Sequence, residues 1–147
     1  MRGHAETLLK DVVARADSPE ASVAHRMAGV THWFAGEYLG AREHLERALA
    51  LFQPGRDDEL ALRFGQDPGV AAMLFLALTL WPLDELECAA ALVRSAEART
   101  AGLTYFGTHA YAHTHAAMFE LMSGDLSRVE TRGPELARIA HRHDLAR

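Results

Sequence analysis

Apolar and small residues recur at helical spacing in three separate parts of the chain. In each part they follow one another at alternating intervals of three and four residues, so they fall on one side of an α-helix. The three series are Tyr38, Ala41, Leu45, Ala48 and Phe52, then Leu86, Ala89, Val93 and Ala96, and finally Leu126, Val129, Gly133, Leu136 and Ala140. The pattern predicts three helices that each bury one side against a neighbour.

Start and stop signals predict further helices between these three. Ser18 before Pro19 and Asp67 before Pro68 each place a residue that can cap a helix ahead of a proline suited to the first helical position. Pro82 disfavours helical geometry at the residue before it. The predicted helices cover about residues 5–16, 19–35, 37–52, 68–80, 83–101 and 104–122, with a seventh from Asp125 and a short helical turn at 60–64.

The turns ahead of the three patterned helices also recur. They lie at Gly36, Asp84 and Gly124, and intervals of roughly 40 to 48 residues are typical of an array of helical hairpins. Because one hairpin cannot bury both of its apolar faces, neighbouring hairpins stack on one another. The sequence therefore predicts one all-α domain of about seven helices, with a leading helix followed by hairpins at about 19–52, 68–101 and 104–141.

The segment 25–49 resembles a tetratricopeptide repeat. Gly29 matches the small residue of that family's first helix, and Gly36 matches its tight turn. The opening and packing positions of the second helix are matched by Tyr38, Ala41, Leu45 and Ala48. The resemblance implies a right-handed α–α superhelix that binds other proteins.

A narrower likeness is found in the next segment. Residues 65–70, together with the break at 80–83, are similar to the repeat region that follows the ATPase module in large bacterial adenylate or guanylate cyclases and related ATP-dependent regulators. This resemblance implies a repeat segment of a signalling protein, whose catalytic activity would lie in domains outside this chain.

Two features depart from the family pattern. Asp84 stands where the family turn favours glycine, so we expect a conformation there that aspartate tolerates. Gly133–Pro134 falls inside the last predicted helix, where proline removes a backbone donor and clashes with the preceding turn. We therefore expect a kink or a break at this point.

The net charge argues against some classes of partner, and the cysteine content bears on disulfides and on location. The 147 residues carry 15 Lys and Arg against 20 Asp and Glu, a net charge of −5. This balance argues against binding to nucleic acid or to an anionic membrane, which both need clustered positive charge. Cys88 is the only cysteine, which excludes an intramolecular disulfide and fits a cytoplasmic location. Its alanine neighbours predict that it is buried.

Candidate chemistry is sparse. No glycine-rich phosphate loop is present, so we expect neither an enzyme nor a cofactor. His109 and His113 lie four residues apart, a spacing that can chelate zinc or nickel, but two ligands are too few for a closed site. We expect them instead to line the inner surface of the array, and His25 and His32 to pack or to lie on that surface.

The first helix of each hairpin lines the inner surface of such an array, where a peptide or helix can bind. The residues expected on this partner-binding surface are His25, Thr31, His32, Met73, Leu80, His109, His113 and Glu120. For Met73 and Leu80 a place in the core is the alternative.

Three functions follow as hypotheses. The leading one is a noncatalytic scaffold that binds a protein or peptide partner. The second is self-association as a homodimer, because the end of an array exposes an apolar face that a second copy can cover. The third is a sensor of a metal ion or small molecule, based on His109 and His113 alone.

Overall fold

The structure is a computed structural model that describes residues 18–142. Within these residues it contains seven helices and no strand, which confirms the predicted all-α fold. The predicted leading helix at 5–16 lies outside the described residues. The helices are α2 (Pro19–Phe34), α3 (Tyr38–Leu51), α4 (Leu60–Phe64), α5 (Pro68–Leu80), α6 (Leu86–Ala101), α7 (Phe106–Ser123) and α8 (Leu126–Arg142).

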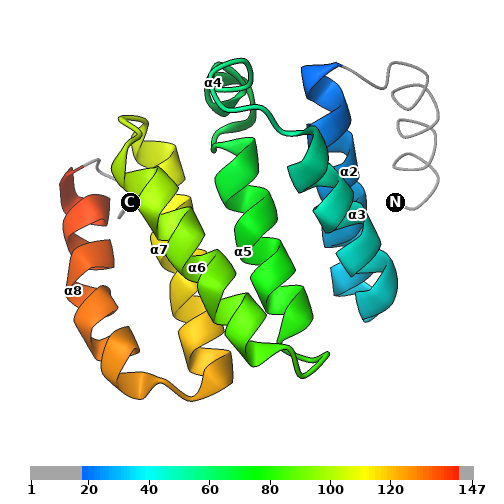
Figure 1. The fold of residues 1–147 in the computed structure, drawn as a ribbon. Coiled ribbons are helices and arrows are strands. Elements are labelled where there is room, and N and C mark those ends of the chain that lie inside the picture. The colour runs from blue at the N-terminus through cyan, green and yellow to red at the C-terminus, as the bar shows by residue number, and fades with distance from the viewer. Residues whose placement is uncertain (1–17, 143–147) are drawn as a thin grey trace.

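The long helices form three hairpins that pack side by side. Helix α2 packs on α3, α5 on α6, and α7 on α8, while α3 and α7 each also contact α5. In Figure 1 the hairpins follow one another from right to left across the molecule. The first helices of the hairpins also touch, α2 with α5 and α5 with α7. These three helices can therefore share one continuous surface.

Helix α5 forms the centre of the core. All of its residues except Met73 are buried, including Val70, Leu74 and Leu78. Helices α3, α6 and α7 contribute small residues and a few large ones to the same cluster, among them Leu45 and Val93. A helix that is apolar all round needs neighbours on every side, and the stacked hairpins provide them.

The two proline-marked helix starts differ in their capping. Asp67 caps α5 as expected, because its carboxylate accepts a hydrogen bond of 2.8 Å from the Val70 N–H. Ser18 has the extended backbone of a cap, but its hydroxyl makes no capping hydrogen bond, contrary to expectation. Its carbonyl instead accepts a hydrogen bond from the Ala21 N–H.

The turn between α5 and α6 explains why α6 begins three residues later than predicted. Asp84 adopts the left-handed conformation, with a φ of 63°. In that conformation the N–H of Asp84 donates to the carbonyl of Trp81, and the N–H of Glu85 donates to that of Leu80. Because a left-handed residue cannot belong to the helix, α6 starts at Leu86.

The break expected at Gly133–Pro134 is absent from helix α8. The helix runs from Leu126 to Arg142 without a break. Gly133 and Pro134 are both exposed, and the space around Gly133 is open. The backbone group that loses its partner at a proline therefore lies in a solvent-facing part of the helix, and the predicted break is wrong.

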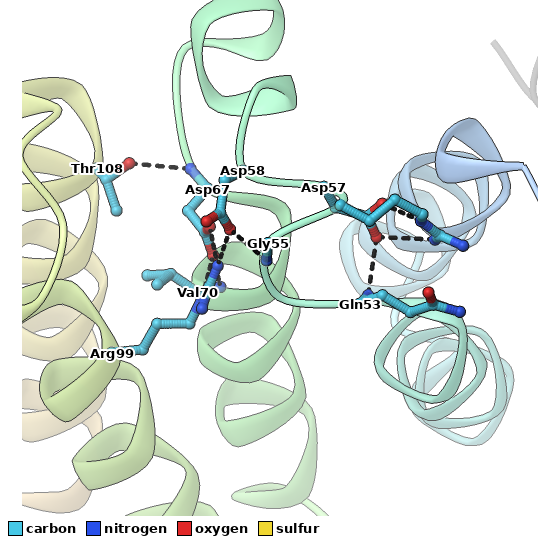
Figure 2. A network of polar contacts seen from close by, with 9 residues as sticks. Gln53, Gly55, Asp57, Asp58, Asp67, Val70, Arg99 and Thr108 are labelled. Carbon is cyan, nitrogen blue, oxygen red and sulfur yellow. Dashed lines mark hydrogen bonds and ion pairs between the residues drawn. The ribbon is translucent and has the colours of Figure 1, made fainter.

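Ion pairs help to hold the long link between α3 and α5, which includes α4, in place (Figure 2). Arg99 of α6 donates hydrogen bonds of 2.9 and 2.7 Å to the two carboxylate oxygens of Asp67, and one of 2.9 Å to Asp58. The backbone N–H of Asp67 donates to the hydroxyl of Thr108 on α7. One arginine thus ties the link to the second hairpin.

Candidate functional site

Aromatic side chains form a row across the first helices of all three hairpins. The row runs from Phe34 and Trp33 on α2, through Phe75 on α5, to His115 and Tyr111 on α7. Successive ring centroids lie 5.0, 5.7, 5.2 and 3.9 Å apart. We call these five residues the aromatic row.

Two hydrogen bonds hold the rings of the row in place. The indole N–H of Trp33 donates to the carbonyl of Leu78 at 3.3 Å. That carbonyl lies four residues before Pro82, which has no N–H to donate to it. The indole of Trp33 therefore supplies a hydrogen bond that the helix backbone cannot make. The imidazole Nδ1 of His115 donates to the carbonyl of Tyr111 at 2.9 Å.

The row combines buried and exposed rings. Phe75 is buried, whereas 74% of the Phe34 surface is exposed. Two turns earlier on α2, Met27 is also exposed. The row therefore presents apolar surface to solvent from a support that is packed into the core, an arrangement typical of a binding surface.

Arg26 is the charged residue associated with the row. Only 9% of its surface is exposed, and its buried Nε has no hydrogen-bond partner. Burial lowers the pKa of Arg26, and nearby Tyr111 partly offsets this change. Burial also raises the pKa of the Tyr111 hydroxyl to about 12. Among the described residues no carboxylate pairs with Arg26.

A histidine cluster lies at the first hairpin, away from the row. Nδ1 of His25 and Nδ1 of His44 are 3.1 Å apart, and the ring of His32 stacks on that of His44 at 5.2 Å. His32 also pairs with Glu37 at 2.7 Å. Burial lowers the pKa of both His25 and His44, and the neighbouring histidines lower it further. His25 and His32 thus contact the partner helix α3.

A cleft of about 430 Å³ lies between α6, α7 and α8. Arg132 of α8 projects into it and donates hydrogen bonds of 2.6 Å to Glu97 and 2.5 Å to Glu120. His113 lies 3.3 Å from the same guanidinium, and its pKa is lowered by burial and then by Arg132. An adjoining hollow of about 270 Å³ is lined by His109. In the cleft, Arg132 thus already pairs with both Glu97 and Glu120.

The structure separates the residues that the sequence placed on one surface. His25 and His32 lie in the histidine cluster, while His109, His113 and Glu120 lie at the cleft. The hydroxyl of Thr31 donates to a backbone carbonyl of its own helix. Met73 is half-buried and packs on the core.

Two of the predicted surface residues are buried. Leu80 belongs to the core cluster, as the alternative interpretation of its apolar side chain expected. Glu120 is covered because Arg132 binds both of its carboxylate oxygens. Neither side chain is available to a partner in this structure, so their placement on the binding surface is corrected.

The metal hypothesis gains no support from the described part of the chain. Nε2 of His109 is already hydrogen-bonded, at 2.7 Å, to the carbonyl of Leu103. In residues 18–142 no group of three or more His, Cys, Asp or Glu side chains is arranged to hold a metal ion. Cys88, which we expected to be buried, is exposed on α6 because it lies next to the inward-facing Ala89.

Sequence reasoning missed the residues of the aromatic row and Arg26. The signal that could have found them is a second series at helical spacing. Arg26, Val30 and Trp33 on α2 lie at intervals of four and three, as do Tyr111, His115 and Met118 on α7. On α2 this series follows His25 and His32 by one residue, and on α7 it follows His109 and His113 by two residues.

Among the helices of residues 18–142, none combines the length and the apolar character needed to span a membrane. Comparison of the chain with protein-family models, with curated proteins and with solved structures finds no match.

Proposed function

We propose that this protein is a noncatalytic scaffold that binds a segment of a partner protein along the first helices of its three hairpins. The observation that carries the proposal is the aromatic row, which crosses α2, α5 and α7 and leaves Phe34 exposed. Aromatic anchors on a rigid support supply most of the binding energy of many interfaces. A tetratricopeptide-like array acting in a cytoplasmic signalling protein fits this function and forms part of the proposal.

Capture of partners with a matched pair of variants tests the proposal. Phe34→Ser removes an exposed ring of the row, while Leu62→Ser removes an equally exposed side chain on α4, with 74% and 73% of their surfaces exposed. We expect the wild type and Leu62→Ser to capture the same proteins from the native cell, and Phe34→Ser to lose them. Equal capture by both variants would remove the row from the interaction.

Self-association is a second candidate, and helix α8 favours it. This helix has no buried residue, and Leu126 at its start is exposed. Apolar surface left at the end of a stack can be covered by a second copy. Sedimentation over a range of concentrations tests this, with Leu126→Ser as the variant expected to weaken a dimer. A monomer at the highest concentration excludes self-association.

A further inference from the structure

Arg26 differs from the other buried arginines of the described chain in having no acidic partner. Arg99 binds Asp67 and Asp58, and Arg132 binds Glu97 and Glu120. Only 9% of the Arg26 surface is exposed, yet its Nε–H has no acceptor and no carboxylate of the described residues interacts with it. Within residues 18–142, Arg99 and Arg132 thus have acidic partners and Arg26 has none.

An unpaired buried charge is unfavourable for folding, since it loses hydration without gaining a counter-ion. An anion that reaches Arg26 would regain both the missing hydrogen bond and the missing charge pairing. Because Arg26 is close enough to Tyr111 to interact with it electrostatically, and lies on the same face of α2 as Trp33 seven residues later, such an anion would bind next to the aromatic row.

We propose that Arg26 binds a carboxylate of the partner segment, with an apolar side chain of the same segment resting on Trp33 and Phe34. This inference rests on the proposed function and specifies the chemistry of the partner. The carboxylate would supply the counter-charge and acceptor that Arg26 lacks among residues 18–142.

The charge of the site favours a carboxylate over a phosphate as the anion that binds Arg26. A single guanidinium matches the single charge of an Asp or Glu side chain, whereas a phosphate carries nearly two charges at neutral pH. The other titratable groups near Arg26 in the row add no positive charge, because burial lowers the pKa of His115 and keeps Tyr111 protonated. The chain as a whole is also acidic, with a net charge of −5.

Binding of defined peptide pools tests the inference. One pool of short degenerate peptides has a fixed glutamate beside a fixed leucine, a second has glutamine in its place, and a third has phosphoserine. We expect the wild type to bind the glutamate pool about 10- to 100-fold more tightly than the glutamine pool, the range for a hydrogen bond to a charged group. Arg26→Met should abolish this preference.

Arg94→Met is the matched control, since it removes a positive charge from an exposed position on α6. It should keep the preference for glutamate. Denaturant unfolding of Arg26→Met should show a midpoint no lower than that of the wild type, because methionine removes an unpaired buried charge. In the wild type, the Nε–H resonance of Arg26 should shift when the glutamate pool is added and stay in place with the glutamine pool, a readout that needs no variant.

The outcomes separate this inference from the proposed function. Equal binding of the glutamate and glutamine pools to the wild type, with both weakened by Phe34→Ser, overturns the carboxylate while the scaffold stands. Tighter binding of the phosphoserine pool also overturns the choice of carboxylate. If no pool binds, the inference fails, and if partner capture also fails, the proposed function fails with it.

Discussion

Gly29 shows how closely two helices of one hairpin approach. A Cβ atom at this position would lie 2.5 Å from Cγ of Leu45 and 3.2 Å from the carbonyl oxygen of Ala41. Leu45 is fully buried, so its side chain has little room to move away. The small residue is therefore required by the contact between α2 and α3.

Replacing Gly29 by alanine should lower the free energy of unfolding by about 1–3 kcal/mol, the usual cost of overpacking a core. Gly102→Ala is the control, because the added methyl group there meets only a carbonyl oxygen at 3.5 Å. The control should be neutral or stabilise by up to about 1 kcal/mol. Urea denaturation of both variants measures the difference, and equal stability would contradict the close contact.

Arg26 illustrates a residue whose role the sequence could not reveal. Its position on α2 follows from the helical pattern, but its burial and its lack of a partner among the described residues depend on tertiary packing, which the pattern along the chain does not show. The same limit applies to Cys88, whose alanine neighbours suggested burial although it points away from the core. Single positions on a helix are assigned correctly only when the neighbouring helix is known.

Asp67 joins three elements through its carboxylate and its backbone N–H. It caps α5, accepts two hydrogen bonds from Arg99 of α6, and lies where its own N–H reaches Thr108 of α7 (Figure 2). Asp67 is fully buried, whereas nearly half of the Asp58 side chain is exposed. The two aspartates that share Arg99 should therefore differ strongly in their contribution to stability.

Asp67→Ala should destabilise the protein by about 3–5 kcal/mol, since it leaves the largely buried Arg99 with only an exposed partner. Asp58→Ala should cost about 1 kcal/mol or less, as expected of an exposed ion pair. Thermal or denaturant unfolding of the two variants checks this order. A similar loss in both would mean that Arg99 does not depend on the buried carboxylate.

At the scale of helices, the sequence predicted most of the fold. Caps and prolines located α5 closely, and Asp84 at the predicted turn adopts a left-handed backbone, a conformation that aspartate tolerates. The break expected at Pro134 does not occur. The expectation considered only the effect of proline on the backbone, whereas the exposed position of Pro134 lets α8 continue. Local signals thus locate helix ends well where they agree and less well where solvent exposure decides.

The binding face was harder to predict than the helices. On α2, His25, Gly29 and His32 form one series at helical spacing, and Arg26, Val30 and Trp33 form another. Periodicity supports both, and only the contact of Gly29 with Leu45 shows that the first series faces α3. The candidate site therefore follows from tertiary packing rather than from the pattern along the chain.

For the molecule as a whole, half-buried histidines link stability to pH. The pKa values of His25, His44, His113 and His115 are all lowered, in each case mainly by burial. The unfolded chain then binds protons more readily than the folded one. Stability should be fully present above the ordinary histidine pKa of about 6.5 and should fall as the pH drops below it, until the lowered pKa values are reached.

We expect the free energy of unfolding to decrease between about pH 7.5 and about pH 5.5. His44→Gln should make this decrease smaller, because it removes one lowered pKa and the repulsion that His44 exerts on His25. His141→Gln, at an exposed position of α8, is the control and should keep the wild-type pH dependence. Denaturant unfolding at several pH values measures the slopes, and an unchanged slope in His44→Gln would contradict the prediction.

The link between α3 and α5 is a suitable site for an insertion or for new chain termini. It is much longer than the link between α6 and α7, and Pro54 and Gly55 at its tip are exposed. The ion pairs that tie it to Arg99 of α6 involve Asp58 and Asp67, which follow that tip in the sequence. New termini or a fluorescent reporter inserted between Pro54 and Gly55 would interrupt no helix, so tagged or circularly permuted versions can be built while Phe34 and its neighbours stay uncovered.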